Sequence, residues 1–280
     1  MADIYLAIGI MLTLAVVAGV LAYRASRGGR RRLGRAIALT CVAVLALHLA
    51  YFRHSLWPAR VLPFSNVVVL SDPRPILIGV LVGVGAALLA GGVLRRTVML
   101  VTLAALGLAA SYGNVLGSPP PLANVWQAGV CRQTSPASCG PAAAATLLAA
   151  HGIRTSEGEM AQLCLTTKAG TAMGGIYRGL KLKTEGTNLR VEVFHGDIDA
   201  LRALDGPALL NVQLNPGPDV DPRYQRDWGW MPGVPHTVVL FRDRAGGLFE
   251  VGDPAVGREL WSRQALDTLW RGEGLRLVPR

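Results

Sequence analysis

The sequence predicts an all-α membrane domain of four helices followed by an α+β domain with an antiparallel sheet. Residues 1–117 contain four long apolar runs, residues 118–126 form a Pro-rich linker, and residues 127–280 have the composition of a globular domain. A hydrophobic content of 51%, a charged content of 16% and a mean hydropathy of +0.37 are too apolar for an ordinary soluble protein.

The four apolar runs are long enough to span a bilayer. They cover about 4–23, 36–52, 76–94 and 98–113. A cleaved signal peptide is the alternative for the first run, but such a peptide has basic residues before its apolar core, and only Asp3 precedes this one. We therefore expect a retained helix. Small residues in the third run, such as Gly79 and Gly83, favour close helix contacts in lipid.

The net charge of +10 lies almost entirely among the apolar runs. Residues 118–280 are close to neutral and contain no basic stripe, so we expect no nucleic-acid partner. The two arginine-rich connections, 24–35 and 95–96, fall on the same side of a four-span bundle. The positive-inside tendency places that side in the cytoplasm. The fourth span then leads outward, and residues 127–280 are expected on the extracytoplasmic side.

The globular part begins with helical patterns and continues with strands. Helices are expected at 139–150, 156–165 and 175–183. Strands are expected in the stretches LRVEVFH, PALLNVQL, HTVVLF, GLFEVGD and LRLV. A run of helices followed by a run of strands favours an antiparallel sheet packed against the helices.

A cysteine stands at the start of the first of these helices. In the stretch CRQTSPASCGPAAAATLL, Ser138 or Cys139 would occupy the N-cap and Pro141 the first turn. Unpaired backbone N–H groups and the positive end of the helix dipole favour a thiolate there. Six residues earlier, Gln133 offers a neutral side-chain donor that could stabilise an oxyanion.

His236 is the best candidate for a base that serves this thiol, because it opens the apolar strand HTVVLF, which can hold an imidazole rigidly. Asp253 follows 17 residues later. A hairpin would return it to His236, where a carboxylate fixes the tautomer of the ring. The other histidines lie in or beside a predicted span or at the end of an element: His48, His54, His151 and His195.

These motifs together resemble the peptidase C39 family in their order and spacing: Gln133, Cys139-Gly140 at a helix start, His236 before an apolar strand, and Asp253-Pro254. The family consists of papain-like cysteine peptidases, best known as the leader-cleaving domains of bacteriocin-exporting ABC transporters. The resemblance covers about 118–280 and implies a papain-like fold without a cofactor. It also implies that Cys139 is the nucleophile, His236 the general base and acid, Asp253 its orienting partner and Gln133 the oxyanion donor.

The arrangement differs from that of the exporters. In those transporters the peptidase domain precedes the membrane helices and works in the cytoplasm, whereas here it follows four predicted spans. The sequence contains no Walker A motif, so we expect neither ATP binding nor export, and double-glycine leaders cannot be assumed as substrates. We expect an integral protein of the bacterial cytoplasmic membrane whose peptidase domain faces outward.

Two functions are consistent with these sequence features. The first is a membrane-anchored cysteine peptidase that hydrolyses peptides or proteins. The second is a catalytically inactive C39-like module that binds peptides or helps to assemble a membrane complex. The complete set of four residues favours the first function.

Other side chains of the globular part also have two interpretations. Trp228 and Trp230, shortly before His236, either bind substrate at the rim of a cleft or cap the core. Cys131 and Cys164 either form a disulfide, which an extracytoplasmic location would allow, or remain free buried thiols. No metal site is expected, because no unassigned Cys/His pair has ligand spacing.

Overall fold

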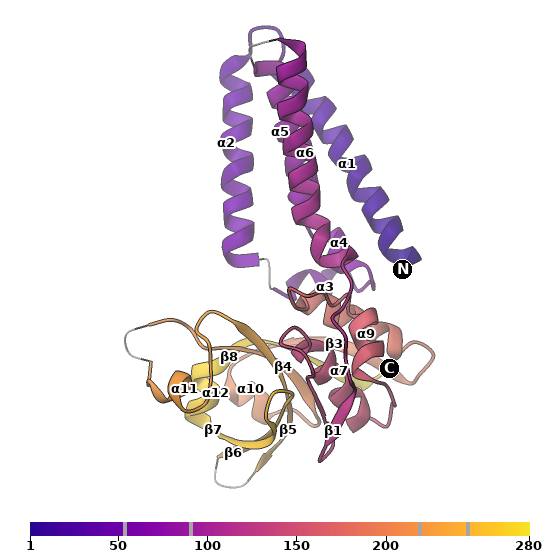
Figure 1. Ribbon diagram of the computed structural model, residues 1–280, viewed down its shortest axis with the longest axis vertical. Coiled ribbons are helices and arrows are strands. Elements are labelled where there is room, and N and C mark those ends of the chain that lie inside the picture. Colours follow the sequence, from indigo (N-terminus) through magenta and orange to yellow (C-terminus); the bar gives the residue numbers. More distant parts are fainter. Residues whose placement is uncertain (53–54, 90–91, 218–219, 245–246) are drawn as a thin grey trace. The chain divides into compact units, whose positions relative to one another are not determined.

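The computed structural model describes residues 1–52, 55–89, 92–217, 220–244 and 247–280 (Figure 1). The chain divides into two compact units. The first contains Met1–Ser55 and Asn66–Leu116, and the second contains Leu56–Ser65 and Gly117–Arg280. His54, and Gly91 of the predicted third span, lie outside the described residues.

Within the described residues, four helices of the first unit are long and apolar enough to cross a membrane. The helical elements are α1 (Ala2–Ser26), α2 (Arg31–Leu47) with its continuation η1 (His48–Phe52), α4 (Val67–Leu70), α5 (Arg74–Leu88) and α6 (Val93–Leu116). The third candidate span combines α4 and α5. The predicted series of four apolar helices before an α+β domain is therefore confirmed.

The connection between the third and fourth helices differs from the prediction, which placed a turn at Arg95 and Arg96. Helix α5 already ends at Leu88, and Leu89 has an extended backbone. Helix α6 begins at Val93, so both arginines lie in its first turn. Two adjacent glycines stand between the helices in the sequence, and glycine weakens a helix interior because it loses the most backbone freedom.

Helices α1 and α5 approach so closely that backbone meets backbone. A Cβ atom added to Gly79 would collide with the carbonyl oxygen of Ala15, and one added to Gly83 would collide with that of Gly19. Apolar helices in lipid gain little from hydrophobic burial against one another, so close packing of small residues is a main source of their association. The glycines of the third run therefore have the packing role that the sequence predicts.

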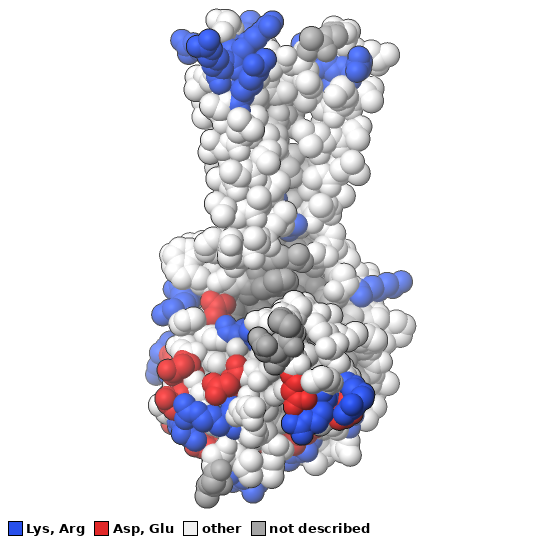
Figure 2. Space-filling view, turned by 90° about the vertical axis from the view of Figure 1, so that its left-hand side faces the viewer, with Lys and Arg blue, Asp and Glu red and all other residues white. Residues whose placement is uncertain are grey.

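The two arginine-rich connections lie at the same end of the first unit. The connection between α1 and α2, together with the start of α6, carries the arginines at 24, 27, 30, 31, 32, 35, 95 and 96. Figure 2 shows basic side chains gathered at this end, followed by a long stretch without charged residues. The two ends of the helical unit are therefore chemically distinct.

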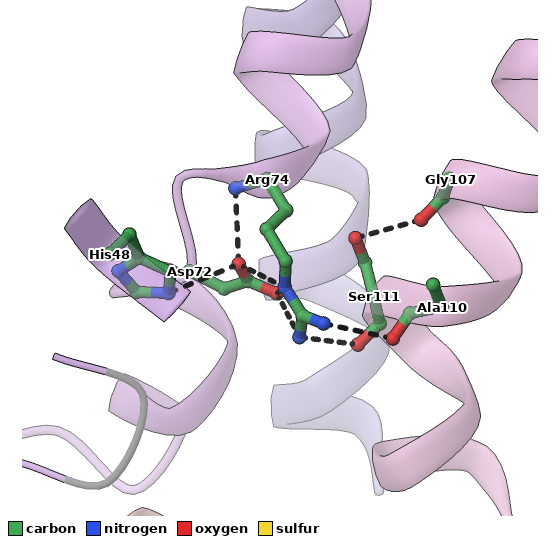
Figure 3. Close-up of polar contacts among 6 residues, drawn as sticks. All are labelled: His48, Asp72, Arg74, Gly107, Ala110 and Ser111. Carbon is green, nitrogen blue, oxygen red and sulfur yellow. Dashed lines mark hydrogen bonds and ion pairs between the residues drawn. The ribbon is translucent and has the colours of Figure 1, made fainter. Parts of the chain in front are cut away.

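At the other end of the first unit, one buried carboxylate joins three helices (Figure 3). Asp72, which is 8% exposed, accepts hydrogen bonds from the backbone N–H and the Nε of Arg74 at 3.0 and 2.8 Å. The guanidinium of Arg74 also donates to the carbonyl oxygens of Ala110 and Ser111 on α6, at 2.9 and 3.3 Å. His48 Nε2, on η1, lies 3.9 Å from Asp72 Oδ1. Arg74 thus neutralises Asp72 and ties it to α6.

In the described part of the second unit, six antiparallel strands form one sheet with the order β3-β8-β4-β5-β6-β7. The strands are β3 (Leu189–His195), β4 (Ala208–Gln213), β5 (Pro235–Arg244), β6 (Leu248–Asp253), β7 (Gly257–Ser262) and β8 (Trp270–Pro279). Strands β1 (Val125–Gln127) and β2 (Val130–Arg132) form a separate hairpin. The predicted antiparallel sheet is present, whereas the short strands β1, β2 and β7 were not predicted.

The predicted helices are α7 (Cys139–Ala150), α8 (Glu157–Leu163) and α9 (Met173–Lys183), and shorter helices are α3 (Trp57–Val61), α10 (Ile198–Arg202), α11 (Arg223–Arg226) and α12 (Arg263–Leu269). Every residue of α7 from 140 to 148 is buried, because the helix is apolar on all sides and packs against β5, β2, α8 and α9. Side chains of β4, β5 and β6 form a hydrophobic core with those of α10 and α12.

Two connecting segments complete the second unit. Residues 118–124 have no regular secondary structure, as three successive prolines predict, and β1 begins inside the predicted linker at Val125. The segment Leu56–Ser65, which lies between the second and third apolar helices in sequence, packs with the second unit. Leu56 is 1% exposed, and its backbone N–H donates to Glu273 Oε2 at 2.9 Å.

We expect Gly79→Val to destabilise the helical unit far more than Gly9→Val. The new side chain at 79 has to displace α1, whereas a Cβ atom on Gly9 meets nothing within 4 Å. Both substitutions add the same β-branched side chain to an apolar helix, so the comparison isolates the close approach. Overpacking of this kind costs about 1–3 kcal/mol. The measurement is the Tm of the detergent-solubilised protein, and equal losses in the two variants would contradict the contact.

Arg74→Met should destabilise the helical unit because it leaves the Asp72 carboxylate buried without its partner. Removing one member of a buried ion pair costs about 3–5 kcal/mol, and we expect the lower end because the Arg74 side chain is 24% exposed. The double variant Asp72→Asn/Arg74→Met removes both charges and should recover most of the lost Tm. A double variant as unstable as Arg74→Met alone would show that the charge pair is not the cause.

Candidate active site

Cys139, a partly exposed residue, is the first residue of α7, so its thiol lies at the positive end of a buried helix. Ser138 forms the N-cap, but its hydroxyl donates back to the carbonyl oxygen of Ser135 at 2.9 Å and caps no helical N–H. A Cβ atom added to Gly140 would lie 2.8 Å from Cδ1 of Ile176 on α9. The glycine after the cysteine therefore allows the first turn of α7 to pack directly against α9.

Strands β5 and β6 bring His236 and Asp253 together. His236 lies opposite Val212 on β4, and its Nε2 is 2.8 Å from Oδ1 of Asp253. Asp253 is the last residue of β6 and only 3% exposed. The same Oδ1 accepts a hydrogen bond from the backbone N–H of Ala255 at 2.7 Å. The carboxylate is thus held from two sides.

The Cys139 thiol is close enough to His236 for the hydrogen bonding and charge of the imidazole to act on it, so Cys139, His236 and Asp253 stand in series. Burial by itself raises the pKa of the Cys139 thiol. The hydrogen bond and charge of His236, together with backbone hydrogen bonds from Thr237 and Gly140, outweigh burial and lower this pKa. Burial likewise opposes the charged form of His236, yet the hydrogen bonds and charges of Asp253 and Cys139 raise its pKa. The arrangement favours a thiolate–imidazolium pair.

Gln133 follows β2. Its backbone N–H donates to the carbonyl oxygen of Pro254 at 2.9 Å, which connects it to the turn after Asp253. Its side-chain amide donates to the carbonyl oxygen of Ser135 at 3.2 Å. The side-chain Oε1 is buried and has no hydrogen-bond partner among the described residues. A primary amide has two N–H donors, so one remains beyond the bond to Ser135.

No sequence pattern points to Glu157, which supports the Gln133 segment from the other side. This carboxylate is fully buried and accepts hydrogen bonds from the N–H and the hydroxyl of Thr134 at 2.8 and 2.6 Å. In the sequence it resembles an ordinary acidic residue in the first turn of a helix, directly after the N-cap Ser156. Only the fold shows that it fixes the neighbour of Gln133.

Trp228 and Trp230, which precede β5 in the sequence, have different surroundings. The ring of Trp230 lies nearly perpendicular to that of His236 at a centroid distance of 5.7 Å, and it makes a similar contact with Trp261 at 5.9 Å. Trp230 therefore packs against the imidazole. Trp228 is 52% exposed; its ring contacts Tyr224 at a centroid distance of 4.8 Å, and the guanidinium of Arg223 lies 5.6 Å from its centroid.

The possible disulfide between Cys131 and Cys164 is not present, and both residues are buried free thiols. The backbone N–H of Cys131, on β2, donates to Thr146 Oγ1 of α7, whereas Cys164 follows α8 and lies against Gly179 of α9. The two cysteines are thus packed by different elements. Burial raises the pKa of both thiols to about 12. Among the described residues, no group of three or more His, Cys, Asp and Glu side chains could hold a metal ion.

A surface hollow of about 550 Å³ lies elsewhere on the second unit. It is lined by Trp126 and Gly129 of the β1–β2 hairpin, Ala150 at the far end of α7, and Phe241 and Arg242 of β5, among others. Its lining includes neither the thiol nor the imidazole. The chemistry of the side chains, and not this hollow, therefore marks the candidate site.

Residues 127–215 match the model of the Peptidase C39 family. The matched segment contains Gln133 and Cys139 and ends before His236 and Asp253. Among curated proteins, an uncharacterized protein of Methanothermobacter marburgensis is 49% identical over 47 residues. That alignment covers 17% of this chain and 33% of the relative, so the chain spans about a third of the length of the curated protein that it matches.

Two solved structures of peptidase domains are also similar to the chain. The first is the peptidase domain of Streptococcus ComA, a bi-functional ABC transporter involved in a quorum sensing pathway. It is 20% identical with a TM-score of 0.41, over 53% of this chain and 96% of that domain. The second is a double glycine motif protease from an AMS/PCAT transporter in complex with the leader peptide. It is 15% identical with a TM-score of 0.41, over 59% of this chain and 97% of that one. Residues 127–215 of the second unit are thus similar to the Peptidase C39 family, and in the sequence they follow four apolar helices.

Proposed function

We propose that this protein is a membrane-anchored cysteine peptidase that hydrolyses peptide bonds of peptides or proteins. The observation that carries the proposal is the series of Cys139, His236 and Asp253: the thiol stands at the start of a buried helix, His236 acts on it, and Asp253 bonds His236 at 2.8 Å. A thiol that is activated by an imidazole, which a carboxylate holds in turn, is the arrangement of nucleophilic acyl transfer. The Peptidase C39 match around Cys139 supports the same chemistry.

Cys139 is the nucleophile of the proposed reaction. Its thiolate sulfur attacks the scissile carbonyl carbon, and the carbonyl electrons move to the oxygen to give a tetrahedral oxyanion. The oxyanion collapses, the C–N bond breaks, and the imidazolium of His236 gives its proton to the leaving amine. A thioester on Cys139 remains. His236, now neutral, takes a proton from water as the water oxygen attacks the thioester, which releases the acid product and restores the ion pair.

Two further side chains stabilise charge during these steps. Asp253 accepts a hydrogen bond from Nε2 of His236, which leaves the other ring nitrogen for the sulfur and stabilises the imidazolium. Gln133 donates its second amide N–H to the oxyanion, while the bond to Ser135 holds the amide group in place. The N-terminal end of α7 adds a favourable dipole for the negative charge.

We also propose a location and partners for this peptidase. Four apolar helices make the lipid bilayer the proposed anchor, and the arginines at one end of these helices support a domain that faces away from the cytoplasm. We propose that this membrane is the bacterial cytoplasmic membrane. The exposed ring of Trp228 is the proposed contact for an extended peptide substrate.

Alkylation of the purified full-length protein with iodoacetamide tests the activated thiol. We expect Cys139 to react at about pH 6, where an ordinary thiol is almost fully protonated. Cys131 and Cys164 should stay unmodified, because burial raises their pKa to about 12. His236→Ala removes the hydrogen bond and charge that lower the pKa of Cys139, so burial, opposed then only by the backbone hydrogen bonds from Thr237 and Gly140, should raise this pKa. The labelling rate at low pH should fall about tenfold for each unit of that rise.

Mass spectrometry of the cysteine-containing peptides measures each rate separately, and the two buried cysteines act as internal controls for unfolding. A Cys139 that titrates like an ordinary thiol, and whose labelling does not change in His236→Ala, would contradict the peptidase. That result would favour the inactive peptide-binding module.

Reporter fusions test the orientation. An alkaline phosphatase fused after Leu122 should be active, because the enzyme folds only outside the cytoplasm, whereas the same reporter after Arg32 should be inactive. The physical reason is the retention of the arginine-rich connections on the cytoplasmic side. A fluorescent protein that folds in the cytoplasm should give the reverse pattern at the two positions. Cytoplasmic signal from the fusion after Leu122 would overturn the proposed orientation.

A further inference from the structure

We infer that Arg132 is a positioning residue of the proposed site. It holds the turn at 253–257 so that the Asp253 carboxylate lies against His236. The inference rests on the proposed function, because it concerns the same Cys139, His236 and Asp253. The described contacts of Arg132 are with the turn and the β1–β2 hairpin, so it acts through Asp253 and not on the reacting atoms.

The turn at 253–257 joins β6 to β7, and Asp253 pairs with Gly257 across it. The N–H of Ala255 donates to Asp253 Oδ1 at 2.7 Å, and the N–H of Val256 donates to the backbone oxygen of Asp253 at 3.2 Å. Oδ1 is also the oxygen that faces His236 at 2.8 Å. The position of the Ala255 N–H therefore sets where the catalytically relevant oxygen lies.

The peptide group between Pro254 and Ala255 is held at both of its polar ends. Its N–H bonds the Asp253 carboxylate, and its C=O accepts from Arg132 Nε at 3.1 Å and from the backbone N–H of Gln133 at 2.9 Å. Because a peptide group is planar, fixing its oxygen also fixes the direction of its N–H. Hydrogen bonds received by the C=O further polarise the N–H and strengthen its bond to the carboxylate.

Arg132 is suited to this task by the shape of its guanidinium. Nη2 donates to the carbonyl oxygen of Ala255 at 2.5 Å, next to the bond from Nε to Pro254, so the planar fork spans two successive carbonyls. Nη1 donates to Gln127 Oε1 on β1, and this bond helps to orient the guanidinium. A lysine ammonium has no such rigid geometry and could replace only part of these bonds.

A purely structural interpretation of Arg132 is that it fastens the β1–β2 hairpin to the sheet. Arg258 provides a matched comparison, because its Nε donates to the carbonyl oxygen of Ala128 in the same hairpin at 3.2 Å. Its other described contacts are an ion pair with Glu250 and a stacking contact with Phe241. Arg258 thus fastens the hairpin without bonding the peptide group behind Asp253.

The experiment compares Arg132→Gln with Arg258→Gln in the full-length protein, by the rate of Cys139 alkylation with iodoacetamide as a function of pH. Arg132→Gln should move the labelling midpoint to higher pH and lower the rate at about pH 6 by about tenfold, which corresponds to one unit. Arg258→Gln should lower the Tm but leave the midpoint unchanged. Arg132→Lys keeps the charge and part of the bonding, so it should shift the midpoint less than Arg132→Gln. It also provides a test if the glutamine variant does not fold.

A double-mutant cycle with Asp253→Asn decides whether Arg132 acts through the carboxylate. Arg132→Gln should shift the midpoint in the wild-type background and have little effect once Asp253 has been neutralised. Equal shifts in both backgrounds, or equal shifts in Arg132→Gln and Arg258→Gln, would overturn the positioning role. A wild-type Cys139 that labels like an ordinary thiol would overturn the proposed function itself. An activated wild-type thiol with an unshifted Arg132→Gln midpoint would overturn only the role of Arg132.

Discussion

The contact between His236 Nε2 and Asp253 Oδ1, at 2.8 Å, is the interaction on which the geometry of the site depends. It connects a side chain at the start of β5 with one at the end of β6, so the antiparallel pairing of these strands is required to form it. Asp253 is buried, and a buried carboxylate is stable in its charged form only with strong partners. His236 is such a partner when it is protonated, and its protonation in turn favours the Cys139 thiolate.

Helix α7 is the second constraint on the site, because the thiol of Cys139 stands at the start of this buried helix. Its residues from 140 to 148 are buried against several elements, so the start of the helix has little freedom to move. The sheet holds the imidazole in the same way, since β5 lies between β4 and β6. A thiol and an imidazole that stand on rigid elements keep their mutual distance, which the proposed proton transfer between them requires.

The parts of the fold that could be predicted are those with a local cause. The apolar helices, the start of α7 at a cysteine followed by Gly-Pro, and the hairpin between His236 and Asp253 all follow from neighbouring residues. Arg132 and Glu157 could not be identified, because their partners lie 123 and 23 residues away in sequence and the pattern around each is ordinary. The end of α5 at Leu88 was missed because the apolar run in the sequence continues past this residue to position 94.

The proposed location outside the cytoplasm makes oxidation the main chemical risk for Cys139, since a thiolate reacts with disulfides and peroxides far faster than a thiol. The second unit limits one route of oxidation within the chain. Cys131 and Cys164 are buried, and burial raises the pKa of both to about 12, so neither offers a thiolate to a sulfenic acid or mixed disulfide at Cys139. An oxidised Cys139 would then depend on an external thiol for its reduction. The same burial that makes these two thiols inert thus keeps the chemistry of this unit confined to the one cysteine that meets His236.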